Sequence, residues 1–387
     1  MAQKARAIAD QPVSPFNRKQ SIPNKQLLKE VICMKTFRGA IVFQTIILLV
    51  SFIQGCSYYQ GTPSDHFDGS CFFNKESDHT FFDHIKWMWE MENIKWPEWI
   101  DDPPQSPPIP HVKEGELRIT YVNHATVLIQ MDGINILTDP IWSERAGPMS
   151  WVGTKRVRAP GIKIEDLPNI DIILISHDHY DHLDMTSLQQ LNEKHQPIIL
   201  AGLGVRRRLE SIEGGKSIIE LDWWQEHIYS KGTKITFVPS RHNSGRGIFD
   251  KNKTLWGGFV IQGSAGSVLF MGDTAVGGFL KEVKNEFSRF RLAILPIGSY
   301  EKRWFMKTQH MNPDDAVTVH KMLDVTQSVG IHFGTFEEHP EQTIDAHEKD
   351  LKVAVEKYNI SESEFWILKF GEGREVPKYL NKSLEMG

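Results

Sequence analysis

The residues best suited to chemistry lie together in one short segment of the chain. Residues 176–184 read Ser-His-Asp-His-Tyr-Asp-His-Leu-Asp, which places His177, His179, Asp181 and His182 within six positions. Imidazole and carboxylate groups together suit zinc, iron or manganese. A single histidine is more often a core or surface residue, but four donors at this spacing are typical of a metal site and offer ligands for two metals.

Further candidate ligands follow apolar runs elsewhere in the sequence. His242, Asp273 and His332 each lie at or just beyond the end of a predicted strand, and the histidine-rich segment itself follows the apolar run Ile172–Ile175. Polar groups at the carboxyl ends of neighbouring strands gather at one edge of a sheet. We therefore expect these side chains to share one site, although Asp273 taken alone is an ordinary turn aspartate.

The sequence pattern around these residues predicts a layered α/β domain over residues 112–387, whose strands and helices must position them. Short, almost continuously apolar runs alternate with helical patterns, as in sheets covered by helices. The predicted strands are Leu117–Val122, Thr126–Gln130, Ile134–Thr138, Ile172–Ile175, Ile198–Leu200, Ile235–Val238, Val268–Phe270, Leu292–Leu295, Gly330–Phe333 and Trp366–Phe370. The predicted helices are Met185–Lys194, Gly204–Ile212, Gly277–Phe287, Pro313–Leu323 and Thr343–Tyr358.

The order His-x-His-x-Asp-His, then His, then Gly-Asp-Thr, then His resembles the metallo-β-lactamase superfamily. That resemblance implies an αββα sandwich with the metals at one edge of the sheets. It also implies a site for two zinc ions. His177, His179 and His242 would bind one ion, Asp181, His182 and His332 the other, and Asp273 would bridge them.

Longer strings resemble the N-acyl-phosphatidylethanolamine-hydrolysing phospholipase D family, over about residues 95–372. The strings are Glu220-Leu-Asp-Trp-Trp224, Leu295-Pro-Ile-Gly-Ser-Tyr-Glu301, Arg303-Trp-Phe-Met-Lys307, Gln309-His-Met-Asn-Pro313 and Ile331-His-Phe-Gly-Thr335. The resemblance implies hydrolysis of a phospholipid substrate to an N-acylethanolamine and phosphatidic acid. The chain departs from vertebrate members of the family at Asn243, where they have Trp.

The same resemblance assigns roles around the metals. His310 would lie beside the phosphate of the substrate, and Asp181 and His310 are the catalytic candidates. Tyr300 and Arg303 are candidates to line a lipid cleft, and packing within the fold is the alternative for both. Two cations lower the pKa of a bridging water to about 7, and outer carboxylates orient the imidazole ligands. Asp139 is a candidate for that orienting role, as are Asp178 and Asp184; a plain turn carboxylate before Pro140 is the alternative for Asp139.

Residues 1–56 are predicted to be an extension that ends in a signal segment. The apolar stretch Ala40–Ile53 follows Lys35 and Arg38. It is shorter than the roughly 20 residues of a membrane span but fits the apolar part of a signal peptide. Read from Met34, it resembles a bacterial lipoprotein signal, which would acylate Cys56 and anchor the protein in the cell envelope. An uncleaved membrane anchor is the alternative.

Residues 57–111 are predicted to be an aromatic arm that ends in a proline-rich linker. Proline runs such as Asp102-Pro-Pro-Gln-Ser-Pro-Pro disfavour helix and sheet. The tryptophans between Trp87 and Trp99 fit two interpretations: the arm packs against the main domain, or it lies at a membrane surface.

The composition of the 387 residues excludes one class of partner. There are 44 Lys+Arg and 49 Asp+Glu, a formal net charge of −5. A nucleic-acid-binding protein needs a basic excess, so we expect no nucleic acid. Loss of residues 1–55 would leave the protein more acidic, so contact with a membrane surface would depend on lipid and aromatic groups. The three cysteines all precede residue 72 and form no disulfide framework.

Two other functions remain open from the sequence. The chain can be another metallo-β-lactamase-fold hydrolase, such as a lactonase or a soluble phosphodiesterase, or an envelope protein with a structural metal. A structural site closes its coordination with protein ligands, whereas seven ligands shared by two metals leave room for water. The ligand count therefore favours a hydrolase.

Overall fold

The computed structural model describes residues 58–76, 79–92, 94–212, 218–229, 232–247, 249–337 and 342–379. The predicted signal segment and Cys56 lie outside these residues. Within the described ranges, no helix has the length and apolar character needed to cross a membrane.

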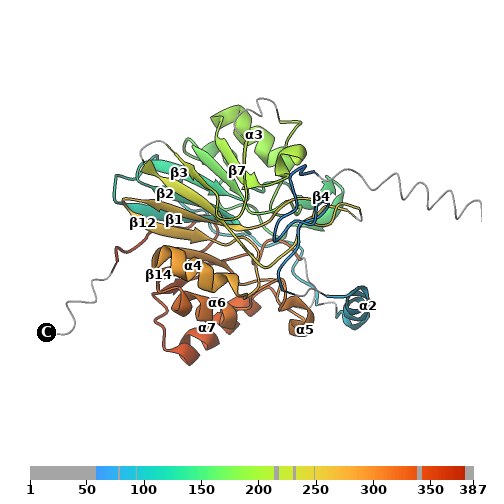
Figure 1. Ribbon diagram of the computed structural model, residues 1–387. Helices are drawn as coiled ribbons and strands as arrows, with labels where there is room; N and C mark the ends of the chain where they lie inside the picture. The colour runs from blue at the N-terminus through green and yellow to red at the C-terminus, as the bar shows by residue number, and fades with distance from the viewer. Residues whose placement is uncertain are drawn as a thin grey trace, which may run out of the picture. The chain divides into compact units, whose positions relative to one another are not determined.

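Two seven-stranded sheets form the centre of the fold (Figure 1), in the orders β16-β1-β2-β3-β6-β7-β8 and β15-β14-β13-β12-β11-β10-β9. The first sheet consists of β1 (Leu117–Asn123), β2 (Thr126–Met131), β3 (Ile134–Thr138), β6 (Ile172–Ile175), β7 (Ile198–Gly202), β8 (Ile218–Leu221) and β16 (Gly373–Glu375). The second consists of β9 (Glu226–Ile228), β10 (Lys234–Val238), β11 (Gly258–Gly263), β12 (Gly266–Phe270), β13 (Phe290–Pro296), β14 (Val325–Ile331) and β15 (Phe365–Trp366). A separate hairpin joins β4 (Arg145–Met149) to β5 (Val152–Lys155).

The sheets are stacked because their strands are apolar on both faces. Ile129 of β2 packs in a core that also contains Phe259 and Leu269 of the second sheet. Its neighbour Leu128 belongs to another core, shared with Leu188 of α3. Successive residues of a strand point to opposite faces, so the first sheet faces the second sheet on one side and a helix on the other.

Helices cover the outer faces of both sheets, which confirms the predicted αββα sandwich. In Figure 1, α3 (Met185–His195) lies beside the first sheet, whereas α4 (Phe279–Phe287), α6 (Pro313–Met322) and α7 (Ala346–Tyr358) lie on the opposite side, beside the second sheet. The remaining helical segments are α2 (Phe81–Glu90), α5 (Arg303–Met306) and the short 3-10 turns Ile164–Asp166 and Val205–Arg208.

Three predicted elements differ from the structure for local reasons. The predicted helix Gly204–Ile212 is only the 3-10 turn Val205–Arg208, which begins after Gly204 at a φ of 85°. Strand β14 ends at Ile331, because His332 has a φ of 64° and leaves the extended region. The predicted strand Trp366–Phe370 was wrong in length, since β15 stops at Trp366. Helices α2 and α5 and strands β4, β5, β8, β9, β11 and β16 were not predicted.

The segment before the proline-rich stretch packs against the main domain. Phe67 and Phe72 are buried in the core shared by both sheets. In α2, the ring of Trp87 stacks on Phe305 with 5.0 Å between centroids. Trp89, two residues further along the helix, is 90% exposed. The packing interpretation therefore holds for Trp87, whereas Trp89 is available for another contact.

His320, a buried histidine outside the cluster of candidate ligands, should make the stability of the protein depend on pH. Its side chain is buried in α6, and burial lowers its pKa from 6.5 to about 4. The unfolded chain then binds a proton at a higher pH than the folded chain, so stability decreases as pH falls from about 6.5 toward 4. We expect a contribution of about 2 kcal/mol lost between pH 7 and pH 5. Urea unfolding of His320→Gln at both pH values should show a smaller decrease than wild type.

The matched control is His111→Gln, since His111 is exposed. That variant should keep the wild-type difference between the two pH values. An equal decrease in His320→Gln and wild type would show that His320 is not the source.

Candidate metal centre

The candidate ligands stand where strands of both sheets end. Strands β3, β6 and β7 run parallel in one sheet, and β12, β13 and β14 run parallel in the other. Asp139 follows β3, His177 follows β6, and Asp273 follows β12. His332 follows β14, and His242 follows the antiparallel strand β10. The fold thereby brings residues that are up to 193 positions apart (Asp139 to His332) to one edge.

Asp273 lies at the middle of the cluster. Its Oδ2 atom is 3.1 Å from His332 Nε2, 3.3 Å from His182 Nε2 and 3.7 Å from His242 Nε2. The same atom is 4.0 Å from His177 Nε2. One carboxylate oxygen is therefore surrounded by imidazoles of both predicted ligand groups, which is the position that a bridging residue needs.

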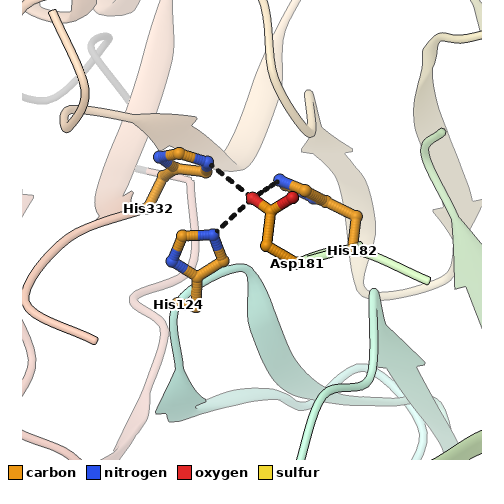
Figure 2. A group of neighbouring side chains, drawn as sticks. All are labelled: His124, Asp181, His182 and His332. Atoms are coloured by element: carbon orange, nitrogen blue, oxygen red, sulfur yellow. Dashed lines mark hydrogen bonds and ion pairs between the residues drawn. The ribbon is translucent and has the colours of Figure 1, made fainter. Parts of the chain in front are cut away.

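The other ligand atoms form two groups. The side chains of His177, His179 and His242 offer nitrogen atoms that lie within 4.8 Å of one another. Asp181, His182 and His332 form a second group of the same compactness, and His124 joins it. Figure 2 shows the imidazoles of this second group around the Asp181 carboxylate. The structure thus assembles all seven predicted metal ligands at one place.

The chemistry of the donor set fits divalent cations. Burial lowers the pKa of His242 to about 3 and that of His177 well below 6.5, so both rings are neutral, as a metal ligand must be. Asp273 is 3% exposed, and its Oδ1 makes no hydrogen bond within the described part of the chain. A buried carboxylate oxygen without a partner is costly, and a cation at this point would satisfy it.

The pKa of His182 is shifted in the opposite direction, upward. Burial opposes its protonation, but the charges of Asp181 and Asp273 and the hydrogen bond with Asp139 raise its pKa well above 6.5. The negative charge that favours a proton on His182 also favours a cation in the same place, so metal binding at low pH must compete with this proton.

Asp139 lies where an imidazole-orienting residue is needed. Its Oδ2 accepts a hydrogen bond from His182 Nδ1 at 2.7 Å, which turns Nε2 of that ring toward the cluster. Its Oδ1 accepts from the backbone N–H of Ser176 at 2.7 Å. The other two candidates do different work: Asp184 accepts from Thr186 N at the start of α3, and Asp178 binds Arg208.

The ion pair of Asp178 and Arg208 supports the histidine-rich loop from behind. Arg208 Nε donates to Asp178 Oδ2 at 2.9 Å, and the Asp178 side chain is 0% exposed. Asp178 Oδ1 accepts from Gly245 N at 2.7 Å, in the loop that follows His242. One buried carboxylate therefore ties together the two loops that carry His177, His179 and His242.

A pocket of about 330 Å³ opens over the cluster. Its lining consists of Trp87, Thr154, His179, Asp181, His242, Asn243, Asp273, Phe305, Met306, Gln309, His310 and His332. His310 Nδ1 lies 3.8 Å from Asp273 Oδ2. The pocket therefore has a polar floor of candidate ligands and an apolar wall of Trp87, Phe305 and Met306.

Tyr300 and Arg303 lie elsewhere. Neither is among the described residues that line this pocket. Tyr300 is 2% exposed and its hydroxyl donates to Asp350. Arg303 pairs with Asp315 and donates to the carbonyl oxygen of His310 at 2.9 Å. Arg303 thus supports the loop of His310, and the structure places neither residue in the lining of the pocket over the candidate ligands.

Sequence reasoning missed two residues of the site, His124 and Trp87. His124 lies in the turn between β1 and β2, and its Nε2 is 2.9 Å from Asp181 Oδ2. Burial lowers its pKa to about 3. It stands alone among Asn123, Ala125 and Thr126, so no ligand spacing marks it. Trp87 was recognised as an aromatic residue of the arm, but its place in the pocket wall depends on a contact across more than 200 positions of sequence.

Known proteins are similar to this chain in sequence and in fold. The family model described as "Beta-lactamase superfamily domain" matches residues 134–333, more than half of the chain. The chain is 39% identical over 235 residues to N-acyl-phosphatidylethanolamine-hydrolyzing phospholipase D 1 of Caenorhabditis elegans, covering 58% of this chain and 65% of that protein. It is 34% identical over 239 residues to the mitochondrial N-acyl-phosphatidylethanolamine-hydrolyzing phospholipase D of Saccharomyces cerevisiae, covering 59% and 50%. The chain thus matches less than two thirds of the length of either relative.

A solved structure agrees at the level of the fold. The isothiocyanate hydrolase from Delia radicum gut bacteria aligns with a TM-score of 0.53 and 20% sequence identity, over 68% of this chain and 100% of that one. The chain therefore belongs to the beta-lactamase superfamily and has the fold of its metal-dependent hydrolases.

Proposed function

We propose that this protein is a binuclear zinc phosphodiesterase of the phospholipase D type, which hydrolyses N-acyl-phosphatidylethanolamine to an N-acylethanolamine and phosphatidic acid. The observation that carries the proposal is the cluster of seven candidate ligands, with Asp273 at its middle, at the floor of a pocket with an apolar wall. The sequence similarity to the worm and yeast phospholipases supports this choice of substrate.

The ligand groups suggest how two zinc ions would be held. His177, His179 and His242 would bind one ion, and Asp181, His182 and His332 the other. Asp273, whose Oδ2 lies between the two groups, would bridge the ions. Two bound zinc ions supply Lewis acidity toward the phosphate oxygens and an activated water nucleophile.

The remaining residues of the pocket would bind and orient the substrate. His310 is placed to donate a hydrogen bond to a phosphate oxygen or to protonate the leaving alkoxide. Trp87, Phe305 and Met306 offer apolar surface to a lipid chain and exclude water from that side. Asp139 keeps the ring of His182 in one orientation and one tautomer.

A membrane surface is the proposed partner. On α2, Phe82 is 79% exposed and Met88 63% exposed, and with Trp89 they lie on one side of the helix while Trp87 reaches the pocket wall. Aromatic and apolar groups beside the pocket suit a substrate that lies in a bilayer. Anchoring in a bacterial envelope through an acylated Cys56 belongs to the same proposal.

The experiment is a product analysis with zinc-loaded protein. Vesicles that contain N-acyl-phosphatidylethanolamine should release an N-acylethanolamine and phosphatidic acid in equal amounts. Vesicles with unmodified phosphatidylethanolamine test the need for the N-acyl group, and a lactone and a soluble phosphodiester test the alternative hydrolases. Turnover of either soluble compound without release from the N-acylated lipid would contradict the proposal.

A further inference from the structure

His124 occupies an unusual place beside the candidate ligands. It lies in the turn between β1 and β2, is 2% exposed, and has a φ of 45°. A residue other than glycine in this left-handed region is uncommon, and such conformations tend to occur at functional sites. The seven-ligand set proposed above does not include it.

The side chain of His124 has a specific contact with Asp181. Its Nε2 is 2.9 Å from Asp181 Oδ2, as Figure 2 shows. An ionised carboxylate only accepts hydrogen bonds, so His124 must be the donor. The same Oδ2 lies 3.0 Å from His182 Nε2 and 3.4 Å from His332 Nε2. The Asp181 carboxylate is therefore held from one side by His124 while it faces the two other candidate ligands.

The backbone of His124 holds a second ligand. The N–H of His332 donates to the carbonyl oxygen of His124 at 2.8 Å, and the N–H of His124 donates to Thr335 Oγ1 at 3.0 Å. His332 itself has a φ of 64°, so two residues in left-handed conformations are joined directly. One turn thus fixes the carboxylate of Asp181 and the main chain of His332.

His124 does not reach the reaction pocket. Asp181 and His332 line the pocket of about 330 Å³, whereas His124 borders a separate cavity of about 20 Å³ beside Phe336. The His124 ring packs edge-on against Phe336, with 5.3 Å between the centroids. The residue lies behind the ligands and would not touch a substrate.

We propose that His124 is a positioning residue that orients the Asp181 carboxylate, through its Nε2–H hydrogen bond, for the metal held by Asp181, His182 and His332. The inference rests on the proposed two-metal centre. If this is so, the affinity of the protein for that one ion depends on the N–H group of His124 and not on the packing of its ring.

The test is zinc titration of metal-free protein against a competing chelator, without substrate. His124→Phe keeps a ring and removes the hydrogen-bond donor. It should weaken the binding of one of the two zinc ions by about 10- to 100-fold. His124→Leu, a smaller side chain without a donor, should do the same, which separates loss of the N–H from misfit of the phenyl group. His124→Gln offers an amide N–H and should recover most of the affinity.

Phe336→Leu is the matched control, because it changes the packing around the His124 ring and leaves the hydrogen bond to Asp181. It should bind both ions as wild type does. Thermal unfolding of each metal-free variant verifies the fold. Wild-type affinity for both ions in His124→Phe and His124→Leu would overturn the proposal. Failure of folded His124→Gln to bind better than His124→Phe would also overturn it, in favour of direct coordination. If the wild-type protein binds two zinc ions but does not hydrolyse the lipid, the proposed substrate is wrong and the proposal for His124 is unaffected.

Discussion

Replacing Asp273 by asparagine should reduce kcat by at least about 1,000-fold, because loss of the proposed bridging ligand would remove several kcal/mol of transition-state stabilisation. Oδ2 of Asp273 lies within 3.1–4.0 Å of four candidate imidazole ligands. A neutral amide of the same shape cannot balance two cations. We also expect the bound zinc to decrease from two ions to one or none. Initial rates with N-acyl-phosphatidylethanolamine vesicles and zinc content per chain measure the two effects.

Asp132→Asn is the matched control, since it neutralises another buried aspartate far from the cluster. The Asp132 carboxylate accepts hydrogen bonds from Gly115 N at 2.7 Å and Ala265 N at 3.0 Å, so it stabilises a turn. That variant should lose stability and keep its zinc and its kcat. A kcat within tenfold of wild type for Asp273→Asn would mean that Asp273 does not bridge the metals.

Replacing Arg208 by leucine should destabilise the metal-free protein by about 3 to 5 kcal/mol, because it leaves the Asp178 carboxylate buried without its cation. The side chain of Asp178 is 0% exposed, and its Oδ2 accepts from Arg208 Nε at 2.9 Å. The double variant Arg208→Leu/Asp178→Asn removes the buried charge of Asp178 but not that of Asp250, the second partner of Arg208, and should recover part of the loss. Urea unfolding of both proteins, with the metal removed, measures the difference.

Arg206→Leu provides the control on the same turn. Arg206 Nε lies 3.8 Å from Glu220 Oε2, and its side chain is 48% exposed. A surface pair of this kind contributes about 1 kcal/mol or less, so the change should be small. If Arg208→Leu costs no more than Arg206→Leu, or if the double variant is less stable than the single one, the ion pair does not support the loop.

The sequence predicted those parts of the site that local spacing encodes. His177, His179, Asp181 and His182 lie within six positions, and the strand before them fixes their direction. The apolar strands predicted a layered α/β domain, and the resemblance to the metallo-β-lactamase superfamily implied the αββα arrangement. His242, Asp273 and His332 were found because each comes at or just after the end of a predicted strand. Position at a strand end marked these residues as candidates, and the resemblance to the metallo-β-lactamase superfamily assigned them as ligands.

Contacts made across the fold could not be predicted. The approach of His124 to Asp181 depends on a left-handed turn between β1 and β2, which no residue spacing indicates. Tyr300 and Arg303 lie in strings that resemble a phospholipase family, but a string does not determine where a side chain points. The structure directs Arg303 toward Asp315 and the His310 carbonyl, which makes it a support for the loop.

The most direct test of this account is anomalous diffraction at the zinc absorption edge from crystals of the zinc-loaded protein. The account predicts two peaks: one among His177, His179 and His242, and one among Asp181, His182 and His332, with Asp273 in contact with both. A single peak, or peaks outside this cluster, would contradict it.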